Sequence, residues 1–258
     1  MPTSYVVTGA SRGLGLELVR QLLSTRPENR VIALARNPAN AKDLNELVKN
    51  KENEGRALVL QANVTDEPSL QAAAEEIEAS ALGANGIDVL INNAGIAQGT
   101  GTVTKSSVQE FRANFETNVI GVVQSTLTLL PLLRKGSKKQ ILSSLVLWAQ
   151  SGEGIKSLGR RRVGLPSPSV AFEEETGPHS ASKTAVNMWT VKLARELESE
   201  GFTVVLQCPG HVQTELGGKD APLTPYDSIN GFLNNTIYKV GPSDTGKFFS
   251  QSGAQHPW

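Results

Sequence analysis

The stretch Val6-Val7-Thr8-Gly9-Ala10-Ser11-Arg12-Gly13-Leu14-Gly15 decides the fold. An apolar run of the β type leads into a glycine-rich turn, and a helical pattern with leucine and valine on one face follows. The glycines allow a tight turn and the close approach of a pyrophosphate, while unpaired backbone N–H groups at the helix start attract anions. The spacing is Gly-x-x-x-Gly-x-Gly. Taken alone, such a turn also fits an ordinary strand-to-helix connection.

Length and composition are typical of one α/β protein. The chain has 258 residues, of which 39% are hydrophobic and 19% charged, which is enough for a substantial core. Basic and acidic residues balance at 25 each, so no net field favours nucleic acid or an anionic membrane. Cys208 is the only cysteine, which excludes an internal disulfide and a cysteine-based metal site, and its apolar surroundings predict a buried structural thiol.

We expect neither a targeting segment nor a membrane span from the sequence. The first strand begins almost at the N-terminus, and no apolar run approaches the roughly 18 residues that a spanning helix needs. We therefore expect a cytoplasmic protein without a bound metal, acting on a small-molecule substrate.

Strand and helix patterns alternate along the chain, which predicts a doubly wound parallel sheet with helices on both faces. The expected strands, about seven in number, lie at 5–7, 30–35, 57–60, 87–91, 140–142, 203–208 and 247–249. After the helix that follows the glycine turn, helical segments are expected at 42–49, 67–82, 108–133, 180–200 and 226–238. No repeat or linker interrupts this order, so we expect a single dinucleotide-binding domain of the Rossmann type over residues 1–258.

One irregular segment, 145–178, separates the fifth strand from the next helix. It contains Arg160-Arg161-Arg162 and Glu173-Glu174-Glu175 and shows no regular period. Loops of this length are uncommon in compact domains, and they are usually functional or disordered. Two interpretations stay open here, a lid over the substrate and a solvated surface loop. A second loop and helix, at 213–240, are expected to contact the substrate.

The order of motifs resembles that of the short-chain dehydrogenase/reductase family. After the glycine turn come Asn92-Asn93-Ala94-Gly95, Asn118, Ser143-Ser144 and Pro209-Gly210, each at the carboxyl end of an expected strand or on the expected helix. Ligands bind at that edge of such sheets. The tail, from Cys208 to Glu215 with the terminal Pro257-Trp258, resembles fungal ketoreductases of the norsolorinic acid ketoreductase type. The resemblance implies an NADPH-dependent ketoreductase for an aromatic or polyketide-like carbonyl in secondary metabolism, and a homodimer or homotetramer.

The second strand favours NADP(H) over NAD. It ends in Ala35-Arg36-Asn37 without a carboxylate, and Arg12 lies in the glycine turn, so two guanidinium groups can clamp a 2′-phosphate. Both positions also suit ordinary surface arginines. By resemblance, Thr214 holds the carboxamide of the nicotinamide and His211 is a surface or supporting residue. The full set of expected cofactor-binding residues is Gly9, Ser11, Arg12, Gly13, Leu14, Gly15, Arg36, Asn63, Val64, Asn92, Ala94, Gly95, Lys183, Pro209, Gly210, Val212 and Thr214.

The expected catalytic residues are Asn118, Ser144, His179 and Lys183. The proton donor of the family is the tyrosine of Tyr-x-x-x-Lys, and the matching stretch here is His179-Ser180-Ala181-Ser182-Lys183, with histidine in the tyrosine position. Four-residue spacing makes His179 and Lys183 neighbours on a helix, and the lysine charge favours a neutral imidazole. By resemblance, Ser144 hydrogen-bonds the substrate oxygen. Asn118 either holds a relay water or only bends its helix.

Three functions from different classes remain open at this point. The first is the ketoreductase. The second is a non-redox enzyme on the same fold, a cyclase, dehydratase or isomerase that uses His179 as base or hydrogen-bond donor. The third is a cofactor-sensing binding protein, against which Asn118, Ser144 and Lys183 argue because a pure binder needs no proton relay.

Overall fold

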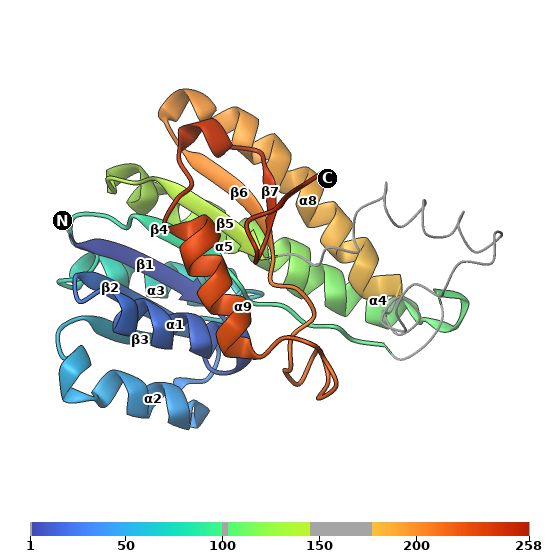
Figure 1. Cartoon of the computed structure of the whole chain (residues 1–258), viewed down its shortest axis with the longest axis horizontal. Helices are drawn as coiled ribbons and strands as arrows, with labels where there is room; N and C mark the ends of the chain where they lie inside the picture. Colours follow the sequence, from blue (N-terminus) through green and yellow to red (C-terminus); the bar gives the residue numbers. More distant parts are fainter. Residues whose placement is uncertain (1, 100–102, 145–176, 258) are drawn as a thin grey trace.

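The computed structural model describes residues 2–99, 103–144 and 177–257. These residues form an eight-stranded sheet in the order β3-β2-β1-β4-β5-β6-β7-β8 (Figure 1). The first seven strands are parallel, namely β1 (Thr3–Thr8), β2 (Asn29–Ala35), β3 (Ala57–Gln61), β4 (Val89–Asn92), β5 (Gln140–Ser144), β6 (Thr203–Cys208) and β7 (Phe248–Ser250). The strand order reverses between β1 and β4, so their carboxyl ends border the crevice where such sheets bind ligands.

The eighth strand corrects the expected number of about seven. Strand β8 (Gln255–His256) pairs antiparallel with β7 and covers the edge of the sheet. Two residues are too few to show a period, which explains why the sequence does not predict it. Strand β5 is also longer than expected, because it continues beyond Leu142 and carries Ser144 at its carboxyl end.

Helices cover both faces of the sheet. On one face, α1 (Gly13–Thr25), α2 (Lys42–Lys49) and α9 (Pro225–Phe232) bury Leu18, Leu44 and Ile229 in a common cluster. On the other face, α3 (Glu67–Ala79), α5 (Gly121–Lys135) and α8 (Gly177–Leu197) bury Leu70, Leu129 and Leu193 in a second cluster. Strands β1 and β6 are buried along their whole length, as expected of parallel strands covered on both sides.

The long helix expected at 108–133 is interrupted. It consists of α4 (Val108–Phe115), a π-helical turn η4 (Glu116–Ile120) and α5. A π turn adds one residue to the helical repeat and is frequent at functional sites. Asn118 lies in this turn and is fully buried. The helix expected at 226–238 likewise ends in a π turn, η7 (Leu233–Ile237), after α9.

Helix α8 begins at Gly177, three residues before the expected start, and this places His179 in its first turn. Residues 177 and 178 of the segment expected to be irregular therefore belong to this helix, and residues 145–176 lie outside the described residues. Its interpretation as a lid or a surface loop stays a prediction. None of the helices in the described ranges combines the length and the apolar character needed to cross a lipid bilayer.

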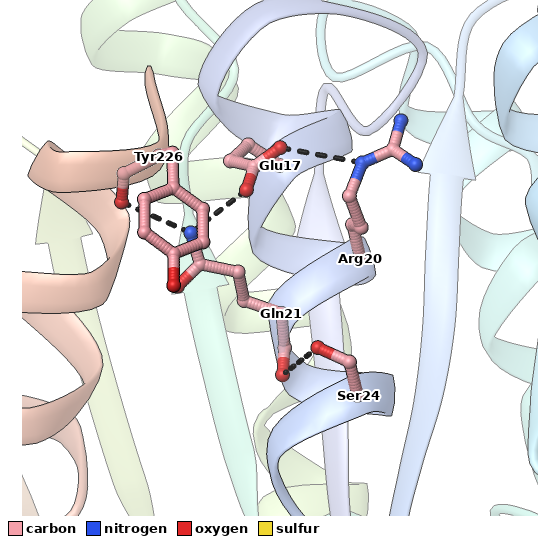
Figure 2. Close-up of polar contacts among 5 residues, drawn as sticks. All are labelled: Glu17, Arg20, Gln21, Ser24 and Tyr226. Carbon is pink, nitrogen blue, oxygen red and sulfur yellow. Dashed lines mark hydrogen bonds and ion pairs between the residues drawn. The ribbon is translucent and has the colours of Figure 1, made fainter. Parts of the chain in front are cut away.

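Polar contacts fix α9 against α1 (Figure 2). Gln21 Nε2 donates hydrogen bonds to the Tyr226 carbonyl oxygen at 3.0 Å and to Glu17 Oε1 at 2.7 Å. Glu17 also pairs with Arg20 across one helical turn. On the strand side, Ser228 Oγ donates to the Pro209 carbonyl oxygen at 2.6 Å. Helix α9 is thus fixed to α1 and to the residue that follows the carboxyl end of β6.

Candidate active site

Backbone packing requires glycine in the turn after β1. Gly9 has φ 66°, and a Cβ there would lie 2.8 Å from the Ala94 Cα atom. A Cβ on Gly15 would lie 2.2 Å from the Gly9 carbonyl oxygen. Thr8 Oγ1 accepts hydrogen bonds from the backbone nitrogens of Asn93 and Ala94 at 3.0 Å, which joins the turn to the end of β4. The turn, α1 and the Asn92-Asn93-Ala94-Gly95 motif therefore form one rigid wall.

The N-terminus of α1 is open to an anion. Its N-cap, Arg12, makes no side-chain capping hydrogen bond, and the first turn contains no acidic residue. The first backbone N–H groups of a helix bind phosphate in this situation. Leu14 packs against the apolar cluster under α1, while Ser11 is half-buried in the turn. These features fit the pyrophosphate of a dinucleotide.

The two expected phosphate-binding arginines lie on the surface. Arg12 Nη1 forms an ion pair of 2.5 Å with Glu215 Oε2, and both side chains are about three-quarters exposed. Arg36 is exposed at the end of β2 and, within the described residues, has no hydrogen bond or ion pair. Arg36 can therefore bind an anion directly, whereas Arg12 can bind one only if its ion pair with Glu215 breaks or is shared.

The loop after β6 faces the glycine turn. A Cβ on Gly13 would lie 3.8 Å from Thr214 Cγ2, and the Arg12–Glu215 pair joins the same two segments. Inside the loop, Thr214 Oγ1 donates to the Val212 carbonyl oxygen at 3.3 Å and accepts from Gly217 N at 3.1 Å. Gly210 has φ 80° and starts this loop after Pro209, while His211 is exposed, as expected.

Asn63, Val64 and Asn92 lie close to this wall with their side chains already engaged. Asn63 Oδ1 accepts hydrogen bonds from the Thr65 backbone and hydroxyl, so only its amide nitrogen remains to bind a base. Val64 is buried, and its Cγ2 atom would lie 2.8 Å from a Cβ on Gly121. Asn92 Nδ2 donates to Thr126 Oγ1 of α5 at 2.9 Å.

Asn118 connects the loop after β4 to α8. Its Oδ1 accepts from Ile96 N at 2.8 Å, and its Nδ2 donates to the Ile96 carbonyl oxygen and to Ser182 Oγ, both at 2.9 Å. Ser182 Oγ in turn donates to the His179 carbonyl oxygen at 2.7 Å. Ser182 is not among the site residues expected from the sequence, although its position directly before Lys183 was the available signal. The π turn therefore fixes the first turn of α8, which carries the histidine.

Lys183 and Ser144 meet at the end of β5. Lys183 Nζ donates to the Ser144 carbonyl oxygen at 3.3 Å, and a Cβ on Gly95 would lie 3.3 Å from the same nitrogen and 3.2 Å from Asn118 Oδ1. The structure thus brings Asn118, Ser144 and Lys183 together beside the end of β4. His179 joins them from one helical turn before Lys183.

His179 is buried and neutral. The residue is only 4% exposed. Burial lowers the pKa of the imidazole from 6.5 to about 4, and the charge of Lys183 is the second cause. The sequence predicted a neutral ring from the lysine charge, whereas burial is the larger effect. Within the described residues the ring nitrogens have no hydrogen-bond partner. A neutral imidazole with both nitrogens open can accept a proton or donate one hydrogen bond.

Comparison with known proteins shows the family of the chain. Residues 4–147 and 171–222 match the family model described as short chain dehydrogenase. The chain is 33% identical to a short-chain dehydrogenase/reductase of Arthrinium sp, over 95% of this chain and 86% of the relative, and 32% identical to a short-chain dehydrogenase of Penicillium roqueforti, over 83% and 80%. The protein therefore belongs to the short-chain dehydrogenase family and is an oxidoreductase of that family.

Solved structures share the fold along the whole chain. The NADPH-bound carbonyl reductase from chicken fatty liver superposes with a TM-score of 0.86 at 26% identity and covers 100% of both chains. The carbonyl reductase Sniffer of D. melanogaster gives a TM-score of 0.83 at 26% identity, again over 100% of both chains. The doubly wound, Rossmann-type sheet is thereby confirmed.

Proposed function

We propose that the protein is an NADPH-dependent ketoreductase for an aromatic or polyketide-like carbonyl in fungal secondary metabolism. The observation that carries the proposal is the cluster of Asn118, Ser144, His179 and Lys183 beside an anion-binding glycine turn. The NADPH bound by the chicken carbonyl reductase and the fungal short-chain dehydrogenase relatives support it. The cytoplasmic location expected from the sequence stays a prediction.

The residues around the glycine turn would hold the cofactor, which supplies a hydride to the carbonyl carbon when bound. The backbone of Gly9 to Gly15 and the N-terminus of α1 bind the pyrophosphate. Arg36 and Arg12 bind the 2′-phosphate, so Arg12 exchanges Glu215 for a more highly charged partner. Thr214 holds the carboxamide. The remaining positions of the expected set would contact the rest of the cofactor, namely Ser11, Leu14, Asn63, Val64, Asn92, Ala94, Gly95, Lys183, Pro209, Gly210 and Val212.

The catalytic residues stabilise the negative charge that develops on the carbonyl oxygen, which takes its proton from solvent. Ser144 donates a hydrogen bond from its hydroxyl, and the neutral imidazole of His179 donates its N–H. The positive charge of Lys183 favours the negative charge that develops on the oxygen and disfavours the imidazolium form. Asn118 fixes the loop at Ile96 and the first turn of α8. A water that relays protons to Lys183 stays a prediction.

The low pKa of His179 also favours a second candidate function. An imidazole with a pKa of about 4 is a free base at neutral pH. It could therefore remove a proton from carbon or oxygen in a cyclisation, dehydration or isomerisation on the same fold. Loss of substrate without consumption of NADPH is the result that distinguishes this function from reduction.

Cofactor choice gives a direct test of the proposal. We expect Arg36→Asp to weaken NADPH binding at least ten-fold, which is about 1.4 kcal/mol, because a carboxylate replaces a cation beside the 2′-phosphate. Calorimetric titration with NADPH and NADH measures the change, and NADH affinity should hold or rise. Arg195→Asp, on the exposed side of α8, is the matched control and should leave both affinities unchanged. Equal affinity of the unmutated protein for the two dinucleotides would contradict the assignment.

We further propose that the protein pairs with a second copy through its long helices, as the family resemblance implies. Large apolar side chains are exposed on α5 and α8, where Leu127 is 53% and Met188 51% accessible. Leu127→Glu places a charge on this surface and should reduce the particle mass measured by light scattering to that of one chain. Leu216→Glu, on an exposed loop residue, is the control that should preserve the mass of the assembly. A monomeric unmutated protein would refute the pairing.

A further inference from the structure

Gln207 is a buried side chain without a partner. It lies on β6 and is 1% exposed, and neither its Nε2 nor its Oε1 atom has a hydrogen-bond partner in the described part of the chain. Buried polar groups are almost always paired, because an unpaired one loses the hydrogen bonds that water gave it. Among the described residues, Gln207 is the one side-chain amide whose two polar atoms are both buried and both without a hydrogen-bond partner. Such a group calls for a physical role.

The register of the sheet places Gln207 directly beside Ser144. The two residues are partners in the parallel pairing of β5 and β6, and side chains in register point to the same face of a sheet. That face is the one covered by α1 and α9, because Leu142 and Val205, two residues earlier on each strand, pack in the cluster of those helices. Ser143 points to the opposite face, where its Oγ accepts a hydrogen bond from Thr190 of α8.

Ser144 combines a backbone fixed by Lys183 with a hydroxyl that is unbonded among the described residues. Its carbonyl oxygen accepts the hydrogen bond from Lys183 Nζ, while the structure shows no hydrogen bond of its Oγ atom to any described residue. An unrestrained hydroxyl rotates and directs its proton anywhere. In an active site of this kind the hydroxyl has to donate its proton to the substrate oxygen. A neighbouring donor that occupies a lone pair of the serine oxygen restricts rotation of the hydroxyl and orients its O–H bond toward the substrate.

We propose that Gln207 is a positioning residue that acts on Ser144, an inference that rests on the proposed ketoreductase function. Gln207 Nε2 donates a hydrogen bond to Ser144 Oγ when substrate is bound, and Ser144 then donates to the carbonyl oxygen. Because the amide is buried, it reaches the substrate only through the serine. In the sequence N–H to O–H to O=C each dipole polarises the next, which strengthens the serine as a donor while negative charge grows on the substrate oxygen.

A double-mutant cycle tests this role. Gln207→Leu keeps the volume and removes both polar atoms, and we expect it to lower kcat about ten-fold while KM for NADPH stays the same. Its melting temperature should hold or rise, because the unpaired buried amide is gone. In a Ser144→Ala background the same substitution should cause no further loss. Full kcat in Gln207→Leu, or an equal loss in both backgrounds, would overturn the inference.

A measurement without turnover separates this inference from the proposed function. The side-chain amide resonances of Gln207 are assigned in isotope-labelled protein by their absence in Gln207→Leu, and they are followed with saturating NADP⁺. Ser144→Ala should shift them, whereas the matched control Ser143→Ala, on the opposite face of β5, should not. Unmoved resonances would overturn the role of Gln207 whatever the activity. A different result is that the resonances shift in a protein that reduces none of the quinones and aryl ketones tested. That result would overturn the proposed function alone.

Discussion

We expect His179→Ala to lower the turnover of carbonyl reduction by about a hundred- to ten-thousand-fold, the usual contribution of a general acid or base. By the family resemblance the imidazole takes the position of the proton donor, and Ser182 holds the His179 backbone in the first turn of α8. NADPH oxidation with a panel of quinones and aryl ketones measures the loss. His256→Ala, on β8 at the far edge of the sheet, is the control and should keep full activity. Unchanged turnover in His179→Ala would remove the histidine from the mechanism.

The reciprocal substitution gives a second arm of the same experiment. His179→Tyr should restore or raise reductase activity, because the proposed function gives Lys183, Ser144 and Asn118 the roles that serve a phenol in the family. If the imidazole instead serves a non-redox reaction, His179→Tyr should abolish that reaction. The pH profile adds a further distinction. A neutral imidazole acting as base gives activity that rises with pH through the pKa of about 4 and stays constant above it, whereas a protonated imidazole acting as acid gives activity that falls through the same pKa.

We expect the second large effect in the dependence of stability on pH. The folded-state pKa of His179 is about 4 and the unfolded value 6.5, so between these values the unfolded chain binds the proton more readily. The sign follows directly: the contribution of the neutral imidazole is complete above pH 6.5 and is lost as the pH falls toward 4. The difference corresponds to about 3 kcal/mol of unfolding free energy.

Urea unfolding at several pH values measures this contribution. The unmutated protein should lose stability between pH 6.5 and 4, and His179→Phe should lose about 3 kcal/mol less over the same interval, because phenylalanine cannot bind the proton. His179→Gln provides a second variant without a titrating ring. His256→Gln should retain the slope of the unmutated protein. Parallel curves for the unmutated protein and both His179 variants would contradict the buried, neutral imidazole.

The parallel sheet could be predicted because its strands are buried on both faces. Strands such as β1 and β6 give continuous apolar runs next to glycine turns, a signal that needs no knowledge of distant residues. Strand β8 has two residues and depends on pairing with β7, so no local pattern predicts it. The π turn at Asn118 was missed for a related reason. One added residue within a long amphipathic run does not change the apolar pattern enough to divide it.

The site was predictable where a motif lies in one stretch of sequence. The glycine turn, Asn118, Ser144, His179 and Lys183 were identified as candidates, and the structure brings them to the carboxyl edge of the sheet. Their roles stay proposals. Contacts between distant segments could not be predicted, such as the pair of Arg12 with Glu215 or the position of Gln207 beside Ser144, because they depend on how elements pack. A glutamine within the apolar run of β6 was the one local signal for the latter.

Transfer of a hydride is the central claim, and isotope labelling tests it most directly. The protein is incubated with an aryl ketone and NADPH that carries deuterium at both C4 positions of the nicotinamide, and the product is examined by mass spectrometry. The account predicts that deuterium appears on the carbinol carbon of the product and that Arg36→Asp reduces the amount formed at low NADPH concentration. A product without deuterium, formed equally well in the absence of NADPH, would contradict the account and favour the non-redox function of His179.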